Sequence, residues 1–262
     1  MKNLLKADFY RLSKNKLVYI SIIVAFILPI LIAAMIFGIK EFLNNIEPES
    51  SPMYDLMLNA HTVVSTTFSF ANNFGIVLPV FATTIIIADI TSGTIRNKLI
   101  LGYNRHKIFF AHFIVTLTYC LTLIIVYASM TALFSSLFLG AGEISQEHMT
   151  SLVYFYILGF FAYVMVSAFA TFLSLSTFSG VGSVILTVAF CLGIGLIATL
   201  FTMVDYSKFE YVVYAIPTFV TTVFQTREIS LTMFLEGLAS LLVFTALFYI
   251  AGTFIFNKKD LK

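Results

Sequence analysis

Charge is scarce in this chain of 262 residues, where Asp, Glu, Lys and Arg make up 11% and apolar residues make up 60%. Soluble domains usually carry about 25% charged and about 45–50% apolar residues. Together with a mean hydropathy of +0.98, this composition excludes a water-soluble core and indicates a polytopic membrane protein. The first sixteen residues are polar and basic. The apolar run behind them is too long for a signal peptide, so we expect no cleavable signal.

Motifs that bind nucleotides or metals are also absent. The chain has no Gly-x-x-x-x-Gly-Lys-Ser/Thr segment, and so no P-loop, and it has neither His-Glu-x-x-His nor Cys-x-x-Cys. The two cysteines, Cys120 and Cys191, lie in separate apolar runs, which indicates neither a disulfide framework nor a metal pair. The four histidines are expected to be interfacial or solvated. We therefore predict no catalytic, cofactor-binding or metal site in this chain, and no nucleic-acid partner.

The interiors of the apolar runs are essentially free of charged residues, since Asp89 lies at the end of one span and Glu236 near the start of the last. A charge at the middle of a bilayer costs at least about 2.5–3.5 kcal/mol, and where one occurs it usually serves a proton relay or a catalytic step. Their absence argues against proton-coupled transport and against hydrolysis within the membrane. The sequence thus predicts a protein that is not itself an enzyme.

Six apolar runs are long enough to cross a bilayer, which requires about 20 residues in a helix. Backbone polar groups in lipid must be hydrogen-bonded internally, so we expect these runs to be helices. The runs are Leu17–Ile39, Ser69–Ala88, Ile108–Leu139, Leu152–Leu175, Gly180–Phe201 and Phe234–Phe256. The predicted fold class is an all-α membrane protein with six transmembrane helices in one domain, residues 1–262.

The distribution of lysine and arginine orients these spans. With the N-terminus inside, twelve of the fifteen cations fall on the cytoplasmic side, and only Lys40, Lys208 and Arg227 fall outside. Lysine and arginine are enriched in cytoplasmic loops. We therefore expect a multi-pass protein of the cell membrane with both termini in the cytoplasm.

The segments between the runs follow from this orientation. Residues 40–68 and 140–151 are predicted outer segments, and Pro48 and Pro52 argue against a continuous helix in the first of them. Residues 176–179 form a short inner turn. Residues 202–233 mix aromatic and charged side chains, which suits an interfacial or re-entrant segment at the outer surface.

The N-terminal segment, residues 1–16, has the pattern of an amphipathic helix. Leu5, Phe9 and Leu12 share one helical face, while Lys6 and Arg11 point elsewhere. Such a helix is expected to lie in the inner interface of the lipid bilayer, where its basic residues meet anionic lipid. The alternative is a frayed tail that only adds positive charge to the inside.

Residues 89–107 form the one interior stretch where polar and basic residues cluster. Asp89 ends the second run, Thr91 or Ser92 is a candidate cap for a short helix, and Gly102 allows the left-handed backbone that ends one. Asn104 is then placed to cap the helix of the third run. An ordinary loop with topogenic charge needs neither this stop and restart nor this length, so we predict a cytoplasmic helix that docks onto a separate protein.

The order Asp89, Gly93-Thr94-Ile95, Leu99, Asn104-Arg105, Lys107 resembles the coupling-helix region of type-2 ABC exporter permeases. In that family an acidic residue ends the second span, Gly-Thr and an apolar stretch follow, and a small polar residue with arginine opens the third span. The chain departs from the pattern at Asp89, where glutamate is usual, and at Gly102-Tyr103, where proline is common. The architecture of the family covers the whole chain, and the motif covers about twenty residues.

The resemblance implies the membrane subunit of an ATP-driven exporter. ABC ATPase subunits would bind ATP and Mg, and a second copy of this permease or a related one would complete the assembly, with small residues of the second and fifth runs at close contacts. The residues that the resemblance assigns to coupling are Asp89, Gly93, Thr94, Ile95, Arg96, Lys98, Leu99 and Arg105.

Within this family, small permeases often export antimicrobial or cytolytic peptides, including lantibiotics. The resemblance therefore implies an amphipathic or hydrophobic cargo of that kind. Two alternatives stay open: an exporter of small drugs or ions from the same family, and a membrane anchor or sensor partner that transports nothing.

Overall fold

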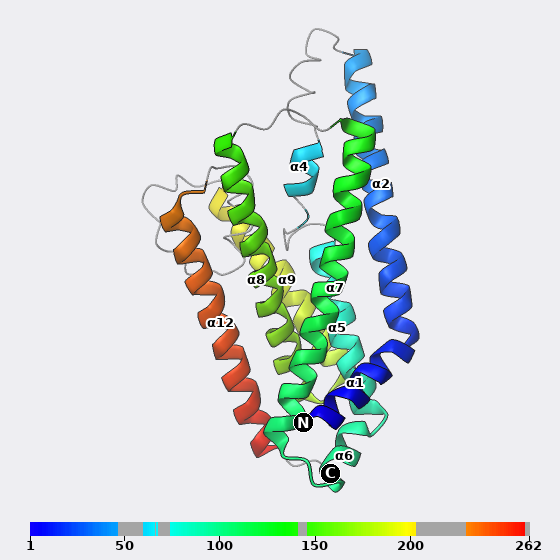
Figure 1. Cartoon of the computed structure of the whole chain (residues 1–262), viewed down its shortest axis with the longest axis vertical. Coiled ribbons are helices and arrows are strands. Elements are labelled where there is room, and N and C mark those ends of the chain that lie inside the picture. The colour runs from blue at the N-terminus through cyan, green and yellow to red at the C-terminus, as the bar shows by residue number, and fades with distance from the viewer. Residues whose placement is uncertain (47–59, 66, 68–73, 141–145, 203–228, 260–262) are drawn as a thin grey trace.

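The computed structural model describes residues 1–46, 60–65, 67, 74–140, 146–202 and 229–259, and every regular element in these ranges is a helix (Figure 1). The helices are α1 (Lys2–Lys14), α2 (Lys16–Ile46), α4 (Ala60–Ser65), α5 (Phe74–Thr91), α6 (Thr94–Ile100), α7 (Arg105–Leu139), α8 (Gln146–Thr177), α9 (Gly180–Thr202) and α12 (Leu231–Lys258). The all-α prediction is confirmed for this part of the chain.

Four of the described helices are long and apolar enough to cross a membrane: α2, α7, the Thr150–Thr177 part of α8, and α12. A fifth candidate is the pair formed by α5 and α6, which is bent by 54°. Within α9, Gly180–Gly193 is a shorter apolar helical stretch. The described part of each predicted run thus lies on a helix, with residues 69–73 of the second run outside the described residues, while the count of six spans stays a prediction.

Several helices extend beyond the apolar runs that located them. α2 continues to Ile46, and α8 begins at Gln146 rather than at Leu152, so the predicted outer turn at 140–151 is shorter than expected. An apolar run marks the part of a helix that suits lipid, whereas the helix itself continues as long as its backbone hydrogen bonds do. Pro48, Pro52 and most of the predicted segment 202–233 lie outside the described residues.

The helices form a bundle with α7 and α8 at its centre in the view of Figure 1. α2 packs along α7 on one side, α12 packs along α8 on the other, and α5 contacts α7, α8 and α9. The N-terminus, α6 and the end of α12 all lie at one end of the bundle (Figure 1). This end, which we call the base, contains the segment that the sequence singles out.

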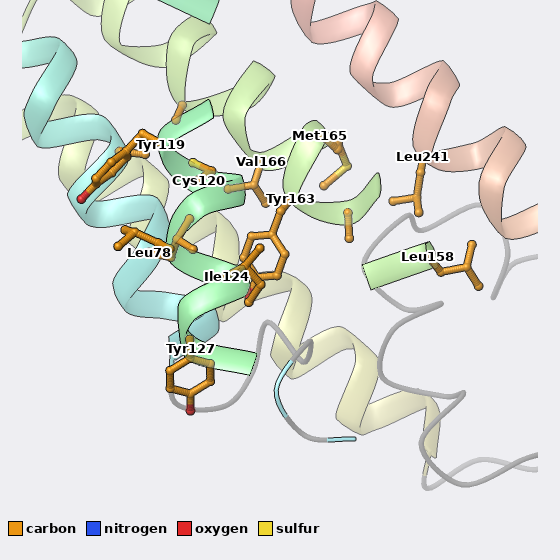
Figure 2. Packing of buried hydrophobic residues seen from close by; sticks show 14 of the residues in the cluster. Leu78, Tyr119, Cys120, Ile124, Tyr127, Leu158, Tyr163, Met165, Val166 and Leu241 are labelled. Atoms are coloured by element: carbon orange, nitrogen blue, oxygen red, sulfur yellow. The ribbon is translucent and has the colours of Figure 1, made fainter. Parts of the chain in front are cut away.

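The main apolar core lies between the central helices and their neighbours. Tyr127 and Tyr163 are fully buried in it, together with Leu158 and Leu241 (Figure 2). Close helix packing of this kind, rather than exclusion of water, holds helices together inside a bilayer. Among the described glycines, the closest approach is at Gly252 of α12, where a Cβ atom would stand 2.5 Å from Cζ of Phe109.

A second apolar cluster closes the base. It joins one or two buried residues from each of five helices, namely Ile86, Ile95, Ile108, Phe109, Leu175 and Phe256. Because Ile95 belongs to α6, this cluster fixes the short helix beneath the ends of the long ones. The position of α6 is therefore set by packing, and not only by its connections to α5 and α7.

Candidate functional site

The chain turns sharply between α5 and α6 at Gly93. This glycine has a φ of +69° and occupies the N-cap of α6, where its carbonyl oxygen accepts from the Asn97 amide at 3.0 Å. Glycine adopts this left-handed conformation without the penalty that a Cβ atom brings. The sequence predicted Thr91 or Ser92 as a side-chain cap, and that was wrong. The hydroxyl of Thr91 bonds back to the carbonyls of α5, and that of Ser92 meets the hydroxyl of Thr94 at 2.7 Å.

The other end of α6 is closed by Gly102, as the sequence predicts. Gly102 has a φ of +80°, its amide donates to the Leu99 carbonyl at 2.9 Å, and the Tyr103 amide donates to the Lys98 carbonyl at 3.2 Å. This pair of bonds is a Schellman motif. Asn104 is the N-cap residue of α7, but its side chain makes no capping hydrogen bond. Two glycines thus delimit a helix of seven residues.

The inner side of α6 is anchored in two ways. Ile95 is only 2% exposed, and it packs with Leu99 and Tyr103 into the apolar cluster of the base. Lys98 also points inward and is buried. A lysine on this side requires an acidic partner, because an unpaired buried charge is very costly.

That partner is Asp8 of α1. The ammonium of Lys98 donates to Oδ2 of Asp8 at 2.9 Å and lies 2.8 Å from Oδ1. Both side chains are nearly inaccessible, at 7% and 2% exposure. Burial lowers the pKa of Lys98 from its usual value, and the Asp8 carboxylate opposes that shift. This ion pair ties the N-terminal helix directly to α6.

A second ion pair runs beside the first. Arg11, one turn after Asp8 on α1, pairs with Asp89 near the end of α5. His112 of α7 stands between the two pairs, with Nε2 at 3.2 Å from the Lys98 ammonium and Nδ1 at 3.7 Å from Asp89. We call these five residues the base network: Asp8, Arg11, Asp89, Lys98 and His112.

The hydrogen bonds of the base network fix the state of His112. An ammonium can only donate, so Nε2 of His112 must accept from Lys98. The imidazole then carries its single proton on Nδ1, on the side facing Asp89. The base network therefore holds two cations, two carboxylates and a neutral histidine, and its charges balance. It joins α1, α5, α6 and α7 at one point.

Arg105 serves a different part of the base. Its Nη1 donates to the main-chain carbonyls of Phe256, Asn257 and Lys259 at 2.9, 3.0 and 2.5 Å. These carbonyls belong to the last turn of α12 and the residue after it, where backbone acceptors lack partners within the helix. The side chain of Lys259 donates in turn to the Ser176 carbonyl of α8. Arg105 thus secures the end of α12 to the start of α7.

The outer side of α6 carries a different set of residues. Arg96 and Asn97 are exposed, and Ile100 and Leu101 at the helix end are 74% and 76% exposed. The other large apolar side chains exposed in the described residues lie at the N-terminus, on α1 or on the long helices. We call these four residues the α6 tip: Arg96, Asn97, Ile100 and Leu101.

The structure divides the residues that the resemblance assigned to coupling. Arg96 is on the outer side of α6, Ile95, Lys98 and Leu99 are on its inner side, and Gly93 and Thr94 form its start. Asp89 lies in the base network and Arg105 at the end of α12. Sequence reasoning missed three residues that stand at this site, namely Asp8, Arg11 and His112.

His106 and His112 lie in different environments. His112 is 3% exposed, so it is not a solvated histidine, and its bond to Lys98 makes this burial possible. His106 is exposed and lies 2.7 Å from the side-chain amide of Asn257. In the ranges that the structure describes, no cluster of three His, Cys, Asp or Glu side chains is arranged to hold a metal ion.

Residues 22–262 match a family described as a protein of unknown function (DUF2705). No curated protein matches the chain.

Proposed function

The chain belongs to the DUF2705 family, whose function is unknown, and we propose that it is the membrane-spanning permease subunit of an ATP-driven exporter of the ABC type. In this proposal, α6 is the coupling helix, and the α6 tip docks onto an ATPase subunit that binds ATP and Mg. The long helices carry the cargo path, with a second copy or a related permease completing it. The base faces the cytoplasm.

The α6 tip is the observation that carries the proposal. Ile100 and Leu101, at the end of α6, are strongly exposed, and α6 lies at the base of the bundle (Figure 1). Apolar side chains on the long helices have lipid to cover them. Leu101 lies outside every candidate span, and Ile100 is the last residue of the bent pair of α5 and α6, the one candidate that contains it. Apolar groups at such a position, beside the basic Arg96, suit a soluble partner protein with an apolar pocket.

The contacts that hold α6 behind its tip support a mechanical role for this helix. Behind the tip, Ile95 is locked into the apolar cluster and Lys98 into the base network, so a force on the tip reaches α1, α5 and α7. A loop that only connected two spans would need no such attachment. Coupling a soluble motor to the membrane requires a short, rigid element of this kind.

The buried polar groups bear on the cargo. Within the described parts of the long helices, buried polar side chains carry hydroxyl groups, such as Thr83, Thr131 and Ser167, apart from His112 near the base. Hydroxyls offer no buried charge for binding an ion. Together with 29 phenylalanines, this favours an amphipathic or hydrophobic cargo, such as an antimicrobial or cytolytic peptide, over a small ion.

Co-purification with candidate ATPase subunits tests the docking. The full chain should capture an ATPase subunit and stimulate its ATP hydrolysis, while the chain alone should hydrolyse none. The double variant Ile100→Glu/Leu101→Glu should lose capture, because carboxylates at the α6 tip cannot enter an apolar pocket. Leu231→Glu is the matched control, since Leu231 is 58% exposed at the start of α12, at the opposite end of the bundle from the base.

Two outcomes would contradict the proposal. ATP hydrolysis by the isolated chain would remove the need for a partner. Equal capture by the wild type and by Ile100→Glu/Leu101→Glu would show that the α6 tip is not the docking surface. Cargo is tested separately, by export of labelled amphipathic peptides from cells that express both subunits.

A further inference from the structure

α1 has two faces with opposite roles. Lys2, Lys6, Tyr10 and Lys14 follow one another at a spacing of four residues, and all four are exposed. At this spacing they lie along one side of the helix. We call them the α1 stripe. The other side of α1 carries Asp8, which is buried in the base network.

The α1 stripe has no acidic partner in the described structure. None of its three lysines forms an ion pair with a described residue, and Lys14 lies over the ring of Tyr10 at 5.8 Å from its centroid. The helix is adjacent to the start of α2 at Lys16, where an apolar span begins. Exposed lysines and a tyrosine at the level where a span meets water suit the headgroups of anionic phospholipids.

The opposite face of α1 connects this surface to α6. Asp8 is paired with Lys98 of α6, and Arg11 is paired with Asp89 at the end of α5. Leu4, one turn before Asp8 on α1, is also buried, at 3% exposure. A displacement or rotation of α1 therefore has to move α6 or break a buried ion pair.

The corner between α1 and α2 is also fixed. The side chain of Asn15 accepts from the Leu17 amide at 3.0 Å, and the hydroxyl of Tyr19 donates to the Ser13 carbonyl at 2.7 Å. These two bonds hold α1 at a set angle to the first span. The helix is thus attached at its end to α2, on one face to α6, and on the other face to nothing within the described structure.

We propose that the α1 stripe binds anionic phospholipid headgroups of the inner leaflet, and that the Asp8–Lys98 pair passes the position of α1 to α6. One consequence rests on the proposed function: the charge of the membrane would set how α6 is presented to an ATPase. The lipid site and its link to α6 do not depend on the proposed function. Both can be measured on the permease alone.

The test uses the full chain in nanodiscs of phosphatidylcholine, with and without phosphatidylglycerol. Native mass spectrometry measures how much phosphatidylglycerol stays bound, and hydrogen exchange measures the protection of the α6 amides. In the wild type, phosphatidylglycerol should bind and should slow exchange in residues 94–100. No ATPase subunit is present, so a failure of the proposed function leaves these readouts unaffected.

Two variants separate the binding of lipid to α1 from the effect of that binding on α6. Lys6→Gln/Lys14→Gln should weaken phosphatidylglycerol binding roughly thirty-fold, because each lysine near a charged membrane surface contributes about 1 kcal/mol. It should abolish the response of α6. Asp8→Leu/Lys98→Met removes both buried charges together, so it should still bind phosphatidylglycerol while α6 no longer responds.

Lys107→Gln/Lys258→Gln is the matched control, because it removes two exposed cations from the same end of the bundle but not from the α1 stripe. This control should bind and respond like the wild type. If it loses as much lipid as Lys6→Gln/Lys14→Gln, binding depends on total charge and the assigned site is wrong. If α6 still responds in Asp8→Leu/Lys98→Met, the ion pair is not the link. A response to inorganic phosphate added without phosphatidylglycerol would assign the stripe to a soluble anion instead.

Discussion

Lys98 and Asp8 are tolerated at the base only because each has the other. Their side chains are 7% and 2% exposed, so neither charge can be stabilised by water. Removing one member of a buried ion pair costs about 3–5 kcal/mol, whereas replacing both by apolar residues is often neutral. The pair therefore specifies how α1 and α6 meet more than it adds to net stability.

Lys98→Met should lower the free energy of unfolding by about 3–5 kcal/mol, because the Asp8 carboxylate stays buried without a cation. Asp8→Leu/Lys98→Met should recover most of that loss. Thermal unfolding of each purified variant in detergent measures both. Arg96→Met is the control on the same helix, and as an exposed substitution it should change stability by at most about 0.5 kcal/mol. Equal stability of Lys98→Met and Arg96→Met would show that the pair is not required.

Sequence could identify several residues of the site but not how they pair. Asp89, Gly93 and Gly102 follow from local chemistry, because an acid at the end of a span and glycines at turns have nearby causes. The bond between Lys98 and Asp8 joins positions 90 residues apart. Nothing local marks Asp8 as a partner, although it is the one acid in a basic segment. Whether Lys98 faces inward depends on how Ile95 packs. A helix of seven residues is too short for its hydrophobic periodicity to show which side is buried.

At the scale of elements, α12 is held by close approach rather than by polar bonds along its length. A Cβ atom on Gly252 would lie 2.5 and 2.8 Å from two ring atoms of Phe109 and 3.3 Å from the Cα atom of Phe172. The Phe109 ring is fully buried, so it has little room to move away. Only glycine lets α12 contact α7 and α8 at this level.

Gly252→Ala should destabilise the bundle by about 1–3 kcal/mol, as overpacking a tight core does. Gly38→Ala is a matched control in α2, because an added methyl group there meets nothing within 4 Å. It should leave stability unchanged or raise it slightly, since alanine favours helix over glycine. Thermal unfolding compares the two. A Gly252→Ala protein as stable as the Gly38→Ala protein would mean that α12 can shift at no cost.

The elements themselves were predictable to different degrees. The apolar runs located α2, α5, α7, α8, α9 and α12, because hydropathy along a chain reports directly on which segments suit lipid. Their ends were not predictable, since α2 and α8 continue into polar residues such as Asn45 and Gln146 without a helix-breaking signal. α6 was predictable because glycine marks both of its ends.

At the scale of the whole molecule, both ends of the described chain and α6 lie at the base, whereas the start of α12 and the end of α2 lie at the opposite end (Figure 1). The excess of lysine and arginine predicts that the base faces the cytoplasm. Exposed positions are present at both ends of the bundle. This allows the orientation to be tested directly.

Single cysteines at Asn45 and Thr232 should react with a membrane-impermeant maleimide added to intact cells, and one at Asn97 should react only after permeabilisation. All three positions are exposed. The native Cys120 and Cys191 are buried and should give little background, which the unsubstituted chain controls. Labelling at Asn97 in intact cells would invert the proposed orientation and separate α6 from any cytoplasmic ATPase.

The attachment of Arg105 to the end of α12 has a consequence for biosynthesis. Its carbonyl partners come 151 to 154 residues later in the chain. At about 5–20 residues per second, a ribosome needs roughly 8 to 30 s to make that stretch. Through this interval α7 is already made, while the carbonyls that accept from the guanidinium at its start have not yet been synthesised. The base can therefore close only after α12 has been inserted, so the newly made protein passes through a period in which its helices are in the membrane but its lower end is open.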